Sequence, residues 1–138
     1  MSLFGKLSTK EHHGLRLMMR FAESYKNHEV ISLNNISGKE GMSVKYLEQL
    51  MIPLKRTKWL QSTRGKAGGY ELIKNPKDIS IKDVIFLFSG NRAIVDCLPP
   101  KNKKCKFSPR CKAKRAWAKV QKTLISTTES IKLSDLIS

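Results

Sequence analysis

The sequence predicts a mainly helical chain with one small β-hairpin and a long C-terminal helix. Apolar residues recur at helical spacing over most of the chain, and a glycine-rich turn separates two short strand candidates after Trp59. A second long helical pattern closes the sequence. We therefore expect a globular region over residues 1–90, a loop over residues 91–108, and a long helix with a short tail over residues 109–138.

The charge balance is far from neutral and constrains the partners of the chain. Its 138 residues include 27 Lys and Arg against 11 Asp and Glu, a formal net charge of +16. Such a surplus favours a polyanion, because neutralising phosphates releases counterions. An anionic membrane surface and a merely soluble basic protein are the alternatives. No apolar run approaches the roughly 18 residues of a membrane span, and no signal-peptide core is evident, so we expect a cytosolic protein.

The first third of the chain predicts two helices. A long helical pattern begins at Ser8, with Leu15, Met18 and Ala22 at helical spacing and apolar residues on more than one side. This first helix is expected to touch both the core and a second subunit. Ser32 is expected to cap a short second helix that ends near Gly38 to Gly41.

A third helix should follow Ser43, which is a good N-cap. Its buried face is predicted from one set of apolar positions: Val44, Leu47, Leu50, Met51 and Leu54. The opposite side is predicted to face solvent or a partner: Lys45, Tyr46, Glu48 and Gln49.

The segment QSTRGKAGGYEL predicts a hairpin whose turn holds three glycines together with Arg64 and Lys66. Glycine permits positive φ and a close backbone approach to a ligand. Two helices followed by a third helix and a basic hairpin are typical of a winged helix-turn-helix, which places one helix in a DNA major groove and the wing near phosphate or the minor groove. The same outline occurs in small domains that bind no nucleic acid. The sequence thus predicts that residues 1–90 form a winged helix-turn-helix DNA-binding domain.

Two further helices are indicated after the hairpin. Ser80 and Asp83 form a capping box for an apolar fourth helix that closes at Gly90. Ser108 as N-cap and Pro109 at the first position predict the start of the fifth helix. An apolar seam on that helix predicts pairing across a two-fold axis, with packing on its own domain as the alternative. The seam consists of Ala113, Trp117, Val120, Leu124 and Ile131.

All three cysteines lie within fifteen residues, at Cys97, Cys105 and Cys111, with the spacing C-x7-C-x5-C. Ten Lys and Arg and no acid fall between Lys101 and Lys122, and positive charge of this kind stabilises thiolates. Three soft ligands suit an iron–sulfur cluster or zinc, each with a fourth ligand, although the wide gaps disfavour structural zinc. Unligated cysteines are the alternative.

These motifs together resemble the Rrf2 family of bacterial winged-helix transcription regulators, of the IscR, NsrR and CymR type. The resemblance covers nearly the whole chain and rests on LSTKEHHGLR, MSVKYLEQLMIPLK, RGKAGGYEL, ISIKDVI and the cysteine loop that begins VDC. It implies a homodimer that binds a palindromic operator in double-stranded DNA. In many members three cysteines of each subunit hold a [2Fe–2S] or [4Fe–4S] cluster whose state alters DNA affinity.

The resemblance also assigns roles to single positions. Arg64 would be the wing arginine in the minor groove, and Trp117 with its seam would form the dimerisation helix. Cys97, Cys105 and Cys111 correspond to the cluster cysteines. The groups expected to face bases and phosphates are Ser43, Lys45, Tyr46 and Gln49 of the third helix, and Lys66, Gly68 and Gly69 of the wing.

The chain departs from the family pattern at two places. Its first cysteine gap is seven residues, where five is common, and Lys114 stands where the IscR branch has a histidine ligand. In the NsrR branch a carboxylate from the first helix of the other subunit is a ligand, and that position aligns with His12. We therefore predict His12 as the fourth ligand, with Glu11 and His13 as the alternatives.

The function expected from the sequence is a transcription regulator that senses redox state, nitric oxide or iron–sulfur supply, rather than an enzyme. No Cys/His dyad is close in sequence, paired acids are absent, and the glycines of the wing lie between strands rather than before a helix. The alternative is a cluster-free regulator of the same fold, controlled by thiol oxidation or by a partner enzyme, as in CymR-type members.

Overall fold

The computed structural model describes residues 9–90, 93, 95, 97–107 and 110–137. Its elements are mainly helical, with a single two-stranded antiparallel sheet in this part of the chain. In chain order they are α1 Thr9–Ser24, η1 Tyr25–Asn27, α2 Leu33–Glu40, α3 Val44–Arg56, β1 Leu60–Thr63, β2 Gly69–Leu72, η2 Pro76–Asp78, α4 Ile81–Ser89, α5 Lys112–Ser130 and α6 Leu133–Leu136. The predicted fold class is confirmed.

Serine caps begin three of the helices, as the sequence predicts. The side chains of Ser32 and Ser43 accept hydrogen bonds from the backbone amides of Asn35 and Tyr46, each at 3.1 Å. Ser80 and Asp83 form a reciprocal capping box at the start of α4. Each cap satisfies a backbone amide that the first turn of a helix leaves without an intrahelical partner.

The start of α5 differs from the prediction. Ser108 and Pro109, the expected cap and first residue, lie outside the described residues. The helix begins at Lys112 instead, and Cys111 is its N-cap, with the sulfur accepting a hydrogen bond from the Lys114 amide at 3.4 Å. The last cysteine is thus the residue at which the loop joins the long helix.

The core lies where α1, α3 and α4 meet above the hairpin. It contains the buried face of α3, except that Val44 is only half-buried, and it takes Val84 and Phe88 from α4. The other apolar side chains of α4 are half-buried, so this helix is less enclosed than its sequence suggests. The fully buried residues include Leu17, Met18, Phe21, Ile36, Leu47, Leu50, Met51, Leu54, Leu72, Ile79 and Leu133.

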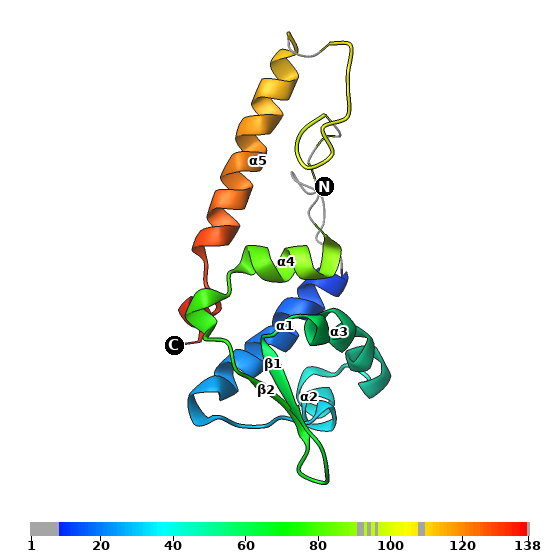
Figure 1. The fold of residues 1–138 in the computed structure, drawn as a ribbon, viewed down its shortest axis with the longest axis vertical. Helices are drawn as coiled ribbons and strands as arrows, with labels where there is room; N and C mark the ends of the chain where they lie inside the picture. Colours follow the sequence, from blue (N-terminus) through cyan, green and yellow to red (C-terminus); the bar gives the residue numbers. More distant parts are fainter. Residues whose placement is uncertain (1–8, 91–92, 94, 96, 108–109, 138) are drawn as a thin grey trace.

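The long helix α5 projects away from this body, on the opposite side from the hairpin (Figure 1). Its base is fixed because the Ile81 amide donates to Ile131 O at 2.9 Å and the Leu133 amide donates to Ile79 O at 2.9 Å. The buried side chain of Leu133 in α6 completes this anchor. In the described part of the chain, no helix is long and apolar enough to cross a membrane.

Candidate nucleic-acid interface and cysteine loop

The helix-turn-helix unit consists of α2, the turn at Gly41 to Ser43, and α3. Gly41 ends α2 with φ of 69°, a left-handed conformation that favours glycine. Lys45, Glu48 and Gln49 are exposed on α3, as predicted. Ser43 is exposed as well, and its hydroxyl hydrogen remains able to donate while the oxygen caps the helix.

Tyr46 lies differently from the other predicted α3 residues. Its side chain is half-buried and packs against the core, and its hydroxyl shares a 3.0 Å hydrogen bond with His13 Nδ1 of α1. The two rings meet edge to face, with centroids 5.4 Å apart. Tyr46 is four residues before buried Leu50, so it lies at the edge of the buried face, and its phenol turns toward α1.

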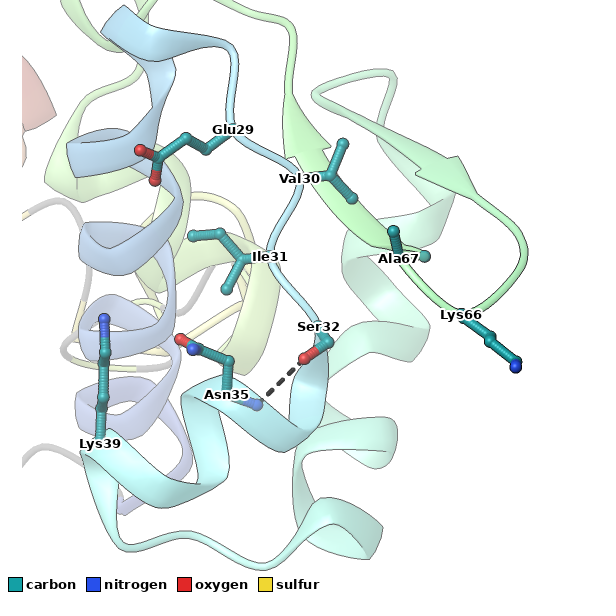
Figure 2. Close-up of a pocket in the computed structure, with 9 residues that line it drawn as sticks. Glu29, Val30, Ile31, Ser32, Asn35, Lys39, Lys66 and Ala67 are labelled. Atoms are coloured by element: carbon teal, nitrogen blue, oxygen red, sulfur yellow. Dashed lines mark hydrogen bonds between the residues drawn. The ribbon is translucent and has the colours of Figure 1, made fainter.

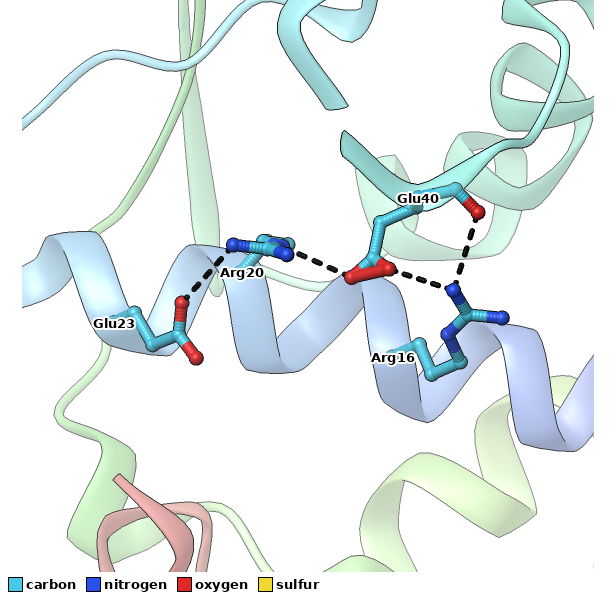
Figure 3. A network of polar contacts seen from close by, with 4 residues as sticks. All are labelled: Arg16, Arg20, Glu23 and Glu40. Atoms are coloured by element: carbon cyan, nitrogen blue, oxygen red, sulfur yellow. Dashed lines mark hydrogen bonds and ion pairs between the residues drawn. The ribbon is translucent and has the colours of Figure 1, made fainter. Parts of the chain in front are cut away.

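Helix α1 also contacts the other end of the turn. Glu40, the last residue of α2, receives Arg16 Nη2 at 2.7 Å and Arg20 Nε at 2.9 Å, and Arg16 also donates to its backbone oxygen at 3.1 Å (Figure 3). Burial raises the pKa of Glu40, but the hydrogen bonds and charges of the two arginines outweigh it and hold the pKa below its ordinary value. No local sequence pattern indicates this network, because its partners lie 20 and 24 residues apart.

The wing is a short hairpin in which Leu60 pairs with Leu72 and Thr63 with Gly69. Arg64 and Lys66 are exposed in its turn, where a side chain is free to meet a nucleic-acid backbone. Ile31 extends the sheet, because Ile31 and Tyr70 exchange two backbone hydrogen bonds of 2.8 Å. The wing is therefore held against the start of α2.

The predicted wing glycines have local structural reasons to be glycine. A Cβ on Gly69 would collide with the backbone oxygen of Ile31, and one on Gly68 would collide with that of Thr63. Both residues are half-buried, so they shape the hairpin whether or not a ligand approaches. Gly65, with φ of 107°, provides the left-handed residue that the turn requires.

A polar pocket of about 340 Å³ lies between α2 and the wing (Figure 2). Lys39 and Lys66 lie at its two sides, and Ser32 caps the helix end that faces it. Its lining contains two lysines and one carboxylate. The remaining lining residues are Glu29, Val30, Ile31, Asn35, Ala67 and Gly68.

The cysteine loop is attached to α5 near its middle. Leu98 is buried, and Gln121 Nε2 donates to Pro99 O at 2.8 Å. Cys97 and Cys111 are half-buried, whereas Cys105 is exposed. Among the described residues, no three His, Cys, Asp or Glu side chains are gathered closely enough to hold a metal ion.

The three predicted candidates for a fourth ligand lie on the first turns of α1. Glu11 is buried and engaged in an interaction, and the ring of His13 is bonded to Tyr46. His12 is exposed. The geometry of α1 thus leaves His12 as the most accessible of the three.

The predicted seam of α5 is exposed at three of its five positions in the described part of the single chain. Trp117 is 43% exposed and Leu124 is 37% exposed, while Ala113 is exposed and Val120 half-buried. In the described part of the chain, Trp117 and Leu124 remain exposed, whereas Ile131, the last residue of the predicted seam, is half-buried at the base of α5 beside α4.

A model of the Rrf2 family, described as iron-dependent transcriptional regulators, matches residues 7–138. The chain belongs to the Rrf2 family. One relative in the family is the protein rrf2 of Nitratidesulfovibrio vulgaris, which is 30% identical over 96% of this chain and 87% of the relative. Another is CymR of Bacillus subtilis, which is 31% identical over 96% of this chain and 90% of the relative.

Solved structures of the family confirm the winged helix-turn-helix with a long C-terminal helix. The structure of CymR, the global cysteine regulator of B. subtilis, matches with a TM-score of 0.78 at 30% identity, over 96% of each chain. That of T. potens IscR matches with a TM-score of 0.75 at 34% identity, over 96% of this chain and 86% of the other. This Rrf2-family chain is therefore a DNA-binding transcriptional regulator rather than an enzyme.

Proposed function

We propose that this regulator is a cytoplasmic homodimer that binds a palindromic operator and adjusts its affinity through an iron–sulfur cluster held by Cys97, Cys105 and Cys111. The observation that carries the proposal is the place of Cys111. It caps α5, so the cysteine loop is joined directly to the helix that bears the exposed apolar seam.

The DNA-contacting groups of the proposal come from the exposed side of α3 and from the wing. Lys45 and Gln49 are exposed on α3, and the hydroxyl of Ser43 is able to donate to phosphate. In the proposal, exposed Arg64 enters a minor groove and exposed Lys66 meets phosphate, while Gly68 and Gly69 shape the wing that carries them. Tyr46 is half-buried, so its proposed contribution to DNA binding is to hold α3 in position.

Dimerisation is proposed through α5. A helix that projects from the body with a large tryptophan partly exposed needs a second surface to cover it. The covering surface in the proposal is the same helix of a second copy, with Ala113, Trp117, Val120 and Leu124 in the contact. A two-fold arrangement of this kind also places two recognition helices for the halves of a palindrome.

The chemistry of the donor set fits an iron–sulfur cluster. Thiolates are the form that binds iron, and cysteine thiolates are the usual ligands of iron–sulfur clusters. The three sulfurs are not gathered in the described residues, so binding would draw the loop together. Exposed His12 of the partner subunit is the proposed fourth ligand, because Glu11 and His13 already have contacts within the chain.

When bound, the cluster would supply a centre that reacts with oxidants and nitric oxide. The chain's own residues provide the connection to DNA binding. Gln121 attaches the loop to α5, and the base of α5 is hydrogen-bonded to the start of α4. A coupling of about 1–3 kcal/mol, typical of allosteric regulators, would change operator affinity roughly 5- to 150-fold.

A cluster-free regulator of the same fold is the second candidate. It is favoured by the absence of a gathered metal site in the described residues and by likeness to a CymR structure from Staphylococcus aureus determined in an oxidized form. In this candidate, oxidation of exposed Cys105 or of Cys111 at the helix terminus, or a partner protein, would provide the signal.

The test compares the DNA affinity of protein purified without oxygen before and after removal of iron by a chelator. The DNA is the tightest duplex selected in vitro with the full-length wild-type protein. We expect a 5- to 150-fold change for wild type, lost in Cys105→Ser and retained in Lys103→Ser, an exposed control in the same loop. An equal affinity in both states of the wild type would contradict the proposal, and a change produced by peroxide alone would favour the second candidate.

A further inference from the structure

The turn of the helix-turn-helix unit is held on both sides by contacts with one polar face of α1. His13, Arg16 and Arg20 follow each other at intervals of three and four residues, so they lie on one side of the helix. Arg16 and Arg20 bind Glu40 at the end of α2, whereas His13 meets Tyr46 in the first turn of α3. The turn from Gly41 to Ser43 lies between these two contacts.

The two contacts differ in what they control. The Glu40 network fixes α2, which braces the unit. The His13 contact is instead on α3 itself, next to exposed Lys45 and one turn before exposed Gln49. Tyr46 is held at both ends, because its amide donates to Ser43 Oγ at 3.1 Å and its hydroxyl bonds His13 Nδ1 at 3.0 Å. Besides its buried face in the core, the first turn of α3 is thus tied to His13 of α1 through the side chain of Tyr46.

We propose that His13 is a positioning residue for DNA recognition: through its hydrogen bond with Tyr46 it sets the orientation of α3, and hence the presentation of Lys45 and Gln49 to the base edges. Neither His13 nor the Tyr46 hydroxyl needs to touch DNA for this role. It also follows that a displacement of the first turns of α1 would reach the recognition helix through the contact between His13 and Tyr46.

The role has a signature that separates it from general stabilisation. A less stable fold lowers the binding of every duplex by the same factor, because the fraction of folded protein falls. A misoriented α3 lowers binding to the selected duplex while contacts with the phosphates of an unrelated duplex persist. The ratio of the two affinities is therefore the quantity to measure.

The experiment is a double-mutant cycle with full-length, chelator-treated protein. Tyr46→Phe removes only the hydroxyl, and His13→Phe keeps a flat ring but loses the hydrogen bond. His13→Gln retains a group that hydrogen-bonds a hydroxyl and is the rescue variant. Tyr25→Phe, which removes the same atom from the first residue of η1, directly after α1, is the matched control. The probes are the selected duplex and a scrambled duplex of equal length.

Each of Tyr46→Phe and His13→Phe is expected to lower the affinity ratio about three- to tenfold, the scale of one partly buried hydrogen bond. The double variant should lose no more than either single variant, and His13→Gln should recover part of the loss. Additive losses, or a loss in Tyr46→Phe without one in His13→Phe, would mean that Tyr46 contacts DNA directly and would overturn the inference. An unchanged affinity ratio would also overturn the inference, whether both duplexes lose affinity equally or neither loses any.

Discussion

Glu40 and Arg16 join the end of α2 to the middle of α1 by an ion pair of 2.7 Å between Oε2 and Nη2. Only 11% of the Glu40 side chain is exposed, and Arg20 binds its other oxygen at 2.9 Å. A carboxylate held in this way is a fixed point for the helix-turn-helix unit, because removing it leaves two guanidinium groups without their shared partner.

Glu40→Gln is expected to lower the free energy of unfolding by about 1–3 kcal/mol, the cost of breaking a partly buried charged hydrogen bond. The pKa of Glu40 is below its ordinary value of 4.5 in the folded chain, so its stabilising contribution is present above that value and is lost as pH falls through the lowered pKa. Urea unfolding at pH 7 and at pH 3 measures both effects.

The matched control for that experiment is Glu23→Gln in α1, which removes the charge of another carboxylate that pairs with Arg20. Glu23 is 54% exposed and pairs with Arg20 at 3.5 Å, so its loss should change stability by less than about 0.5 kcal/mol. Equal effects of the two substitutions, or a Glu40→Gln effect that is the same at both pH values, would contradict the assigned role of Glu40.

Gly14→Ala is expected to destabilise the fold by about 1–3 kcal/mol, because the new Cβ would enter the space of the Phe88 ring where α1 crosses α4. Gly38→Ala is the control. No atom lies within 4 Å of a Cβ at Gly38 in α2, so this change should be neutral or stabilising by up to about 1 kcal/mol. Thermal unfolding at one fixed protein concentration measures the stability of both variants. Adding Phe88→Leu to Gly14→Ala should recover part of the lost stability, because it removes the ring that the new Cβ meets.

Arg64→Ala is expected to weaken binding to the selected duplex and to flatten its salt dependence by about one unit of slope, because one cationic contact with the DNA is lost. Lys77→Ala, at exposed Lys77 of η2 away from the wing turn, removes the same charge and serves as the control. A titration across salt concentrations measures both. An unchanged slope in Arg64→Ala would exclude a contact between Arg64 and the DNA.

Trp117→Glu is expected to weaken dimerisation at least about tenfold, since a buried aromatic anchor contributes on the order of 2 kcal/mol to an interface. Lys119→Glu reverses a charge on an exposed residue of α5 outside the apolar seam and should have a smaller effect. Sedimentation equilibrium gives the dissociation constants. A wild-type protein that stays monomeric, or a Trp117→Glu protein that dimerises as well as wild type, would rule out the seam as the interface.

Local chemistry explains what the sequence alone predicts correctly. The caps at Ser32, Ser43 and Ser80 each join a side chain to an amide three residues away, and the hairpin is specified by its own glycines. The contacts that no local pattern indicates join distant segments: His13 with Tyr46 is 33 residues apart, and Ile31 pairs with Tyr70. Helical periodicity places Tyr46 just outside the apolar positions of α3, which predicts an outward side chain. The direction of its ring depends instead on its contact with α1.

The central claim is best tested by the visible absorption spectrum, with iron and acid-labile sulfide analysis, of protein purified without oxygen. We predict a brown protein that contains iron and sulfide and whose absorption is less stable in His12→Ala than in wild type. An unchanged His12→Ala spectrum would move the fourth ligand to Glu11 or His13. Colourless wild-type protein without iron would contradict the cluster and leave a DNA-binding regulator controlled by its thiols or by a partner protein.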